Sequence, residues 1–169
     1  MLMNMNDAKS RRTGQWKAYG AGIIISEATG ALSGYLARGG MESYPSAVQQ
    51  PILSPPPEVF PIVWTILYVL MGIGSARIFL AEPSAVRTKG LFLFGVQLGF
   101  NFFWSILFFN LRLFAAAFFW LAAMWILILK MIQAFYQVDR PAAWLQIPYI
   151  LWVTFAAYLN AGVWILNRM

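Results

Sequence analysis

The chain has 169 residues, of which 60% are hydrophobic and only 11% are charged. Ordinary soluble domains are about a quarter charged, so this chain cannot cover a globular surface with polar groups, and a lipid environment is expected. It contains no cysteine and no histidine. This excludes disulfide and thiolate chemistry and removes the commonest metal ligand, haem ligand and general base. We therefore expect neither a metal site nor a cofactor.

The net charge of +6 is a value that nucleic-acid-binding proteins also show. Here, however, four of the twelve basic residues lie in an N-terminal tail, residues 1–17, and the others lie mostly near the ends of apolar segments. Charge in these places is typical of membrane flanks, so no nucleic-acid partner is expected. The four basic residues of the tail are Lys9, Arg11, Arg12 and Lys17.

Five apolar segments approach the length of about 20 residues that a transmembrane helix needs. The tail is thus followed by one membrane domain, residues 18–169, for which we predict an all-α bundle of five transmembrane helices. Three of the connections are short, so consecutive helices there must be antiparallel neighbours. The distribution of Lys and Arg favours a cytoplasmic N-terminus and an external C-terminus. The predicted spans are Ala18–Leu36, Val59–Leu80, Gly90–Phe109, Leu113–Met131 and Leu145–Leu166.

The connection Ala37–Glu58 is longer than the others and rich in proline. Together with Pro61 it holds six of the nine prolines of the chain. Proline restricts its own backbone and that of the preceding residue, so this loop is expected to be extended and stiff. It is either a linker without a role of its own or a lid over one end of the bundle.

Aromatic and amide side chains form stripes on three of the predicted spans. Phe60, Trp64 and Tyr68 recur at every fourth residue of the second span, which places three rings on one helical face. Polar groups inside a span usually face the bundle interior, so the stripes that contain amides predict inward-facing walls. Packing of the core alone is the alternative explanation. The other stripes are Gln97, Asn101, Trp104 and Phe108 in the third span, and Tyr149, Trp152, Ala156 and Asn160 in the fifth.

Two further features lie inside the spans. Glu27 is the only acidic residue well inside one, and an intramembrane carboxylate is a functional candidate by default. Alternatively it is neutral or bonded to nearby hydroxyls such as those of Ser26 and Thr29. Small residues separated by three others, as in Gly30-Ala-Leu-Ser-Gly34 and more loosely around Gly72, predict close helix contacts within the bundle or in a dimer.

Motifs between about residues 26 and 164 resemble the TspO/MBR family, also called translocator proteins or tryptophan-rich sensory proteins. Their order and spacing within a five-span layout carry the resemblance, since no single motif would be specific. The motifs are Ala28-Thr-Gly-Ala-Leu32, Pro55-Pro56-x-x-Val59-Phe60, Val63-Trp64-x-x-Leu67-Tyr68, Met71-Gly72, Gln97-x3-Asn101-x2-Trp104, Phe108-Phe109, Tyr136-Gln137-Val138, Pro148-Tyr149-x2-Trp152 and Phe155-Ala156-x2-Leu159-Asn160.

The resemblance implies an integral multi-pass membrane protein that forms a homodimer, in a bacterial membrane or, in a eukaryote, in the mitochondrial outer membrane. It implies a receptor or sensor for porphyrin-type ligands such as protoporphyrin IX, or for other flat hydrophobic ligands including sterols, held in a pocket under the first loop. A regulatory or transport role would accompany binding. The alternatives are an enzyme of light-dependent porphyrin degradation, in which Trp64 and Trp152 would act, and a transporter of tetrapyrroles or sterols.

The stripes and the resemblance together predict the residues that bind the ligand. Ala156 and Leu159 enter because matching residues lie in the ligand and sterol region of the family. In the loop the chain departs from the family pattern: Tyr44-Pro45 stands where Trp-Tyr is frequent, and Gln50-Pro51 where Lys-Pro is frequent. The predicted ligand-binding residues are Phe60, Trp64, Tyr68, Gln97, Asn101, Trp104, Tyr149, Trp152, Ala156, Leu159 and Asn160.

Overall fold

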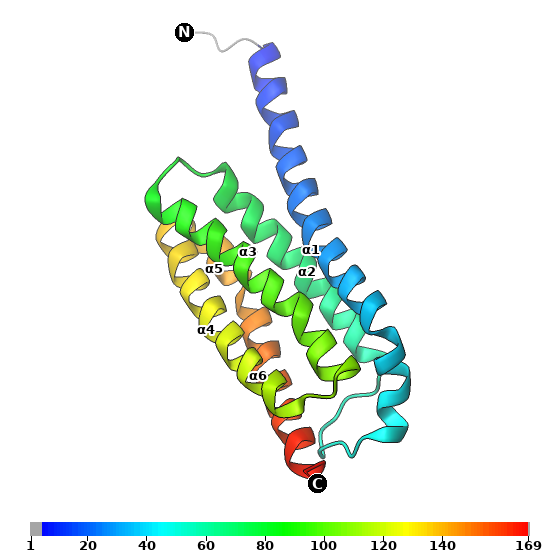
Figure 1. The fold of residues 1–169 in the computed structure, drawn as a ribbon. Coiled ribbons are helices and arrows are strands. Elements are labelled where there is room, and N and C mark those ends of the chain that lie inside the picture. The colour runs from blue at the N-terminus through cyan, green and yellow to red at the C-terminus, as the bar shows by residue number, and fades with distance from the viewer. Residues whose placement is uncertain (1–4, 169) are drawn as a thin grey trace.

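The computed structural model describes residues 5–168, and it describes side chains from residue 14 onward. Lys9, Arg11 and Arg12 of the predicted tail therefore lie outside the described side chains. All regular elements of the described part are helical (Figure 1). They are α1 (Met5–Ala47), α2 (Val59–Leu80), α3 (Ala85–Ser105), the π-helical turn η1 (Ile106–Asn110), α4 (Phe114–Val138), α5 (Arg140–Trp144) and α6 (Ile147–Leu166).

The helices form an elongated antiparallel bundle whose termini lie at opposite ends (Figure 1). In it α1 packs mainly on α2 and also on α3, while α4 packs on α3 and α6. The short α5 leads directly into α6, and η1 continues α3, so the described part of the chain forms a bundle of five long helical segments. The prediction of an all-α, five-helix membrane bundle is confirmed.

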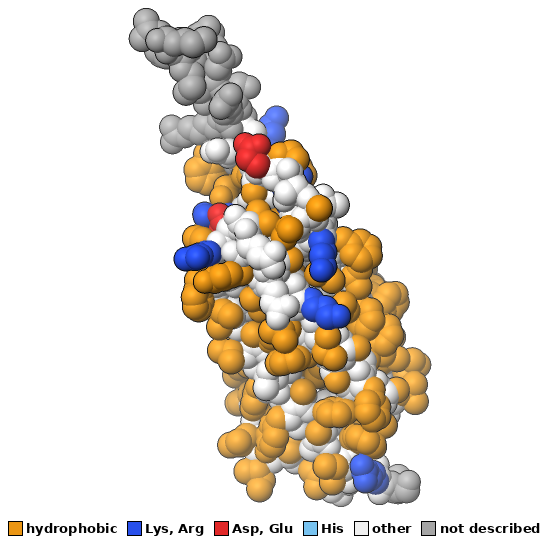
Figure 2. Space-filling model, turned by 90° about the vertical axis from the view of Figure 1, so that its left-hand side faces the viewer, with side chains coloured by type: hydrophobic (Ala, Val, Ile, Leu, Met, Phe, Trp, Pro, Cys, Tyr) orange, Lys and Arg blue, Asp and Glu red, His pale blue; other side chains and the backbone are white. Residues whose placement is uncertain are grey.

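Four helical segments of the described chain are long and apolar enough to cross a membrane: Val59–Leu80, Ala85–Asn110, Phe114–Val138 and Arg140–Leu166. α1 falls short of this standard because its sequence mixes glycine, serine, threonine and Glu27 with apolar residues. Its outer face is nonetheless apolar, with Ile24 and Tyr35 each more than half exposed. On the face shown in Figure 2, apolar side chains cover most of the bundle, and charged ones gather mainly toward the end where α1 projects.

α1 is longer in both directions than the predicted first span. With 43 residues it extends through the predicted tail and beyond the bundle, since the sequence before Pro45 contains no proline to end it (Figure 1). It also continues to Ala47, so the prediction that residues 37–58 form an extended loop is wrong for its first half. Only residues 48–58 are non-helical before α2.

The last turns of α1 persist because the link between α3 and α4 holds them. Asn110 Nδ2 donates to the carbonyl oxygen of Leu36 (2.9 Å), and Arg112 donates to the hydroxyl of Ser43 (3.0 Å). The ring of Tyr44 packs edge-on against Phe109, with centroids 5.3 Å apart. In the final turn the missing N–H of a proline removes only one helical bond, which these contacts offset.

The predicted connection 132–144 is also mostly helical, interrupted at Asp139. The Asp139 carboxylate caps α5 by accepting from the amide of Ala142 (2.8 Å), and it forms a two-bond ion pair with Arg77 of α2 (3.0 and 2.8 Å). The hydrogen bond from the Arg77 guanidinium is the main cause that lowers the pKa of Asp139 below its ordinary value. This ion pair ties α2 to the junction of α4 and α5 at the end of the bundle opposite the C-terminus.

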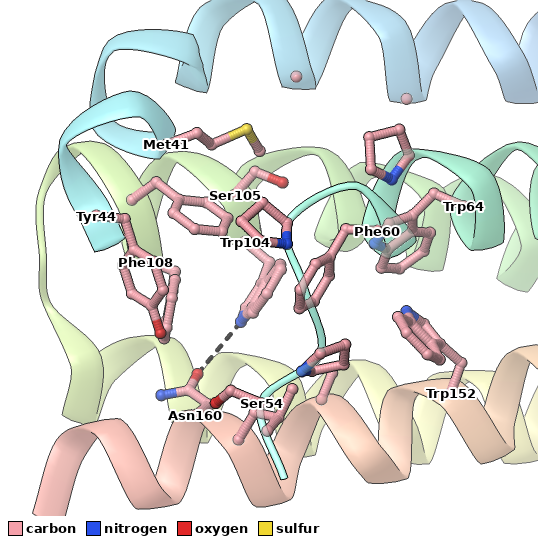
Figure 3. Close-up of a pocket in the computed structure, with 18 of the residues that line it drawn as sticks. Met41, Tyr44, Ser54, Phe60, Trp64, Trp104, Ser105, Phe108, Trp152 and Asn160 are labelled. Carbon is pink, nitrogen blue, oxygen red and sulfur yellow. Dashed lines mark hydrogen bonds between the residues drawn. The ribbon is translucent and has the colours of Figure 1, made fainter. Parts of the chain in front are cut away.

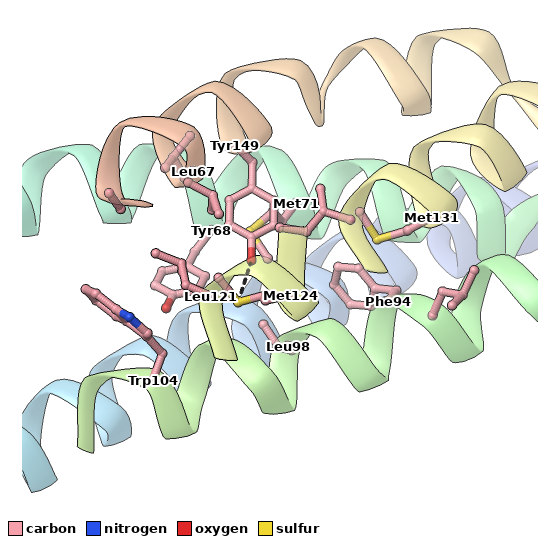
Figure 4. Close-up of a cluster of buried hydrophobic side chains, with 14 of the residues drawn as sticks. Leu67, Tyr68, Met71, Phe94, Leu98, Trp104, Leu121, Met124, Met131 and Tyr149 are labelled. Carbon is pink, nitrogen blue, oxygen red and sulfur yellow. Dashed lines mark hydrogen bonds between the residues drawn. The ribbon is translucent and has the colours of Figure 1, made fainter. Parts of the chain in front are cut away.

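The core is filled by methionine and aromatic side chains between α2, α3, α4 and α6 (Figure 4). Close helix approach depends on glycine where the sequence predicted it: a Cβ on Gly72 would lie 2.5 Å from the Cα of Ile23. Gly34 differs, because a Cβ there would meet no atom within 4 Å. Gly72 thus serves the crossing of α1 and α2, whereas Gly34 faces open space.

Candidate ligand-binding cavity

A cavity of about 290 Å³ lies among the C-terminal half of α1, the loop 48–58, the start of α2, the end of α3 with η1, and α6 (Figure 3). Small-molecule sites have volumes of roughly 300–1,000 Å³, so this cavity is at the small end of that range. Its lining is mostly aromatic, aliphatic and proline side chains. It lies toward the end of the bundle that holds the C-terminus.

Aromatic rings from α2 and α6 form two of its walls. Trp64 and Tyr68 stack with centroids 5.4 Å apart and planes inclined by 28°. From the facing helix, Trp152 meets Phe60 edge-on, with centroids 5.9 Å apart. Ring faces and edges held in this way favour a flat, apolar ligand, which gains from stacking and from the burial of its surface.

α3 and η1 supply a third aromatic wall. Trp104 stacks on Phe108 with a centroid distance of 5.2 Å and an angle of 22°. In η1 the i to i+5 hydrogen bond from Leu111 to Ile106 (3.0 Å) replaces the α-helical pattern. Both Phe108 and its neighbour Phe109 line the cavity. π-turns often occur at functional sites, and this one ends α3 at the cavity.

A buried polar network joins the α2 wall to α3 and α6. The hydroxyl of Tyr68 donates to Asn101 Oδ1 (2.5 Å), and Asn101 Nδ2 donates to the hydroxyl of Tyr149 (3.3 Å). Tyr149 in turn donates to Gln97 Oε1 (2.7 Å). Because polar groups in an apolar interior need partners, this chain fixes α2, α3 and α6 relative to one another.

Asn160 secures the opposite side of the cavity. Its Oδ1 accepts from Trp104 Nε1 (3.3 Å; Figure 3), and its Nδ2 donates to the carbonyl oxygen of Phe114 (2.8 Å). Both ends of the amide are thereby used within the protein. Asn160 therefore positions Trp104 and the start of α4. These two hydrogen bonds occupy its amide oxygen and one of its amide N–H groups.

The structure brings most of the predicted site residues to one cavity. Gln97 and Tyr149 do not line it; both are fully buried behind the wall, in the polar network. The amide of Gln97 and the hydroxyl of Tyr149 hold the helices in place and do not reach a ligand in this conformation. The predicted residues that line the cavity are Phe60, Trp64, Tyr68, Asn101, Trp104, Trp152, Ala156, Leu159 and Asn160.

The loop 48–58 closes one side of the cavity, as expected of a lid. It is tied to the end of α6, because the amide of Gln49 donates to Asn167 Oδ1 and Asn167 Nδ2 donates to the Gln49 carbonyl, both at 2.9 Å. Pro51 packs against Gly162, where a Cβ would lie 2.7 Å from the proline ring. The loop and its flanks contribute Tyr44, Pro45, Gln50, Ser54, Pro55 and Pro57 to the lining.

The sequence analysis missed the contribution of α1. Gly30 and Gly34 line the cavity, and Met41 lines it two turns further on. The glycine spacing was visible, but it predicted helix packing; Gly30 does pack, since a Cβ there would lie 2.0 Å from the ring of Tyr68. Only knowledge of where α1 lies could show that Gly34 borders a ligand site.

Glu27 lies on α1 one turn before Gly30 and is not among the cavity-lining residues. The hydroxyls of Ser26 and Thr29 donate to the carbonyls of Gly22 and Ile25 in their own helix, so the alternative in which they bond Glu27 is wrong. Glu27 Oε1 is buried without a hydrogen-bond partner among the described residues. The carboxylate therefore stands beside the site and not in it.

The chain is similar to known proteins of one family. The model of the TspO/MBR family matches residues 22–165. The tryptophan-rich protein TspO of Chlorobaculum tepidum is 36% identical over 126 residues, 73% of this chain and 79% of the relative. That of Archaeoglobus fulgidus is 32% identical over 151 residues, 87% and 95% of the two chains. The translocator protein of Ovis aries is 36% identical over 121 residues, 70% and 72%.

The match spans the helices and the loop that build the cavity, and the relatives agree with the resemblance drawn from the motifs. The helices long and apolar enough to cross a membrane and this kinship together make the protein an integral, multi-pass membrane protein. The chain belongs to the TspO/MBR family.

Proposed function

We propose that the protein is a membrane receptor or sensor that binds a porphyrin-type ligand in the cavity beneath the loop 48–58. The observation that carries the proposal is the set of tryptophan and phenylalanine rings that converge on one cavity from α2, α3 and α6. A flat conjugated ligand presents a large apolar face to such rings. The lining holds no pair of acidic and basic side chains, so binding, with signalling or transfer as its consequence, is the function it supports best.

Trp64 and Trp152 are the expected contacts with the face of the ligand. They come from α2 and α6 and line the same cavity (Figure 3), and Phe60 of α2 meets Trp152 edge-on. The polar network of Tyr68 and Asn101 holds the α2 wall in place behind them. Stacking and shape are expected to account for most of the affinity, since the chain has no histidine or cysteine to bind a central metal ion.

Titration with protoporphyrin IX in the dark tests the proposal, with quenching of tryptophan fluorescence as the readout. We expect saturable quenching, and roughly tenfold weaker binding for Trp64→Phe or Trp152→Phe, because each loses ring area against the ligand. Trp144→Phe is the control: Trp144 is exposed at the far end of the bundle and does not line the cavity. Absence of saturable quenching in the unaltered protein would refute the receptor.

A second candidate function is light-dependent degradation of the bound porphyrin. It is favoured by two indole rings at one ligand site, of which the Trp152 Nε1 group is buried without a partner among the described residues. Illumination of the loaded protein separates the candidates. Bleaching with a new absorbing product that disappears in Trp64→Phe and Trp152→Phe would support degradation, whereas an unchanged spectrum supports a receptor alone.

A further inference from the structure

The cavity has a mouth on one side, between the last turns of α1 and the beginning of α2. The lining residues that are exposed all lie there, whereas the remainder of the lining is buried or half-buried. A ligand that extends beyond the cavity must therefore do so between α1 and α2. The exposed lining residues are Met41, Pro45, Gln50, Pro57 and Pro61.

The interior offers nothing to balance a charge. No Lys, Arg, Asp, Glu or His is among the described residues that line the cavity. A carboxylate taken inside would lose its hydration without gaining a counter-ion, which is strongly unfavourable. With a volume of about 290 Å³, the cavity is also at the small end of the range for small-molecule sites. Acidic substituents of such a ligand must lie in the mouth.

Arg38 is the arginine that the fold places beside this mouth. It follows the cavity-lining Gly34 by four residues and precedes the cavity-lining Met41 by three, so it lies on the same side of α1 as both. Its side chain is exposed, and its guanidinium lies 4.2 Å from the centroid of the Tyr35 ring. The ion pair found among the described residues joins Arg77 and Asp139 and does not involve Arg38. The guanidinium of Arg38 can therefore pair with an acidic group of a ligand.

Two other arginines lie near this end of the bundle. Arg112 donates to the hydroxyl of Ser43 (3.0 Å), and Arg168 lies 4.5 Å from the ring centroid of Trp164 on α6. Arg168 follows the end of α6, whereas Arg112 reaches the residue before the cavity-lining Tyr44. Two exposed acids do flank the mouth, since Glu42 follows Met41 and Glu58 follows Pro57. Arg38 and Arg112 are therefore the cations near these two acids.

Resting on the proposed function, we infer that Arg38 receives a carboxylate of the ligand at the mouth and makes the site selective for acidic flat ligands over neutral ones of the same shape. A guanidinium suits this role because it pairs with a carboxylate through two parallel hydrogen bonds and is weakly hydrated for a cation. Its contact with the Tyr35 ring orders the guanidinium while the site is empty. Neutral ligands such as sterols gain nothing from it.

Protoporphyrin IX and its dimethyl ester provide a test, because they share the macrocycle and differ in two carboxylates. Both are titrated in the dark into protein in phosphatidylcholine nanodiscs, with tryptophan quenching as the readout. We expect the unaltered protein to bind the diacid several-fold more tightly than the ester. Arg38→Gln is expected to weaken diacid binding about tenfold and to leave ester binding within a factor of two.

Arg140→Gln is the matched control. Its guanidinium also lies over a tyrosine ring, 5.1 Å from the centroid of Tyr136, but at the opposite end of the bundle. We expect it to change neither affinity. Raising the salt concentration should reduce the preference for the diacid in the unaltered protein, since the mouth is exposed to solvent.

Three results would overturn the inference while leaving the receptor intact: equal affinity of the unaltered protein for both ligands, equal losses of both in Arg38→Gln, or a preference that survives this substitution. Equal losses would mean that Arg38 shapes the mouth by packing alone. Absence of saturable binding for both ligands in the unaltered protein is a different outcome, because it refutes the proposed function itself.

Discussion

The two ends of the bundle are built on opposite principles. At the end that holds Asp139, which we call the closed end, Asp139 is paired with Arg77, and the Arg87 guanidinium donates to the carbonyls of Ile78 and Phe79. Here a Cβ on Gly74 would lie against the side chain of Gln146. At the other end, which we call the cavity end, Gly34 faces open space and the lining carries no charge.

The difference indicates where stability and binding reside. At the closed end a Cβ on Gly72 or Gly74 would clash with neighbouring atoms, so substitutions there act on the fold. In the cavity end the helices are kept apart by rings and by the loop 48–58, and a ligand can complete the packing that the chain leaves incomplete. Substitutions at matched positions in the two halves should therefore separate loss of fold from loss of binding.

The largest effect is expected for Gly72→Leu, in the half of α2 toward the closed end. A Cβ at this position would lie 2.5 Å from the Cα of Ile23, and backbone cannot move aside as a flexible side chain can. We expect a loss of more than about 4 kcal/mol of stability, enough to prevent assembly of α1 on α2. Size-exclusion chromatography and thermal unfolding of the purified protein measure this loss.

Gly34→Leu is the counterpart at the cavity end. Because nothing lies within 4 Å of its Cβ position, the protein should fold with an unfolding temperature within a few degrees of the original. The leucine side chain would occupy cavity space, so protoporphyrin binding should weaken at least tenfold, or about 1.4 kcal/mol. A fold as damaged as that of Gly72→Leu would contradict the contrast between the two ends.

A smaller effect is expected for Asp139→Asn at the closed end. Asparagine is as good a helix cap as aspartate, so the substitution removes the charge of the ion pair with Arg77 and keeps the cap of α5. Since both side chains are partly exposed, we expect a loss of about 1–2 kcal/mol at neutral pH. Binding at the distant cavity should not change.

The pH dependence identifies the charge as the cause. The pKa of Asp139 is lowered in the folded protein, so its contribution is present above the ordinary aspartate pKa of about 3.9 and is lost as the pH falls through the folded value. Thermal unfolding from pH 7 down to pH 3 should therefore show Asp139→Asn converging with the unaltered protein. Glu82→Gln, at an exposed residue of the connection between α2 and α3, is the control and should run parallel to the unaltered protein.

The sequence predicted the bounds of α2 better than those of α1. α2 begins and ends at the residues predicted, Val59 and Leu80, because its apolar run is bounded by proline and polar residues on both sides. α1 was misjudged because its last turns depend on contacts with Asn110 and Arg112, which lie more than sixty residues away in the chain. Propensity at Pro45 argued for a loop, and tertiary contacts overrode it.

The candidate site shows the same division. The spacing and polarity of the side chains correctly predicted that the stripes of α2, α3 and α6 face one interior. They could not tell which stripe residues reach the cavity, because a hydroxyl that holds two helices together and one that meets a ligand have the same spacing. Tyr68 lines the cavity, whereas Tyr149, equally polar and equally inward, is fully buried in the network behind it.

The smallest expected effect follows from that distinction. Tyr149→Phe removes the hydroxyl that donates to Gln97 and accepts from Asn101, so both amides lose a partner inside the bundle. Hydrogen bonds between membrane helices contribute about 0.6–1.7 kcal/mol each, and we expect a loss of about 1 kcal/mol. Tyr136→Phe, at an exposed residue of α4, should leave the unfolding temperature unchanged. Protoporphyrin affinity should stay within a factor of two, because Tyr149 lies behind the wall. A tenfold loss of affinity without loss of stability would show that the Tyr149 hydroxyl contacts the ligand. Tyr149 would then belong to the binding site and not to the core behind it.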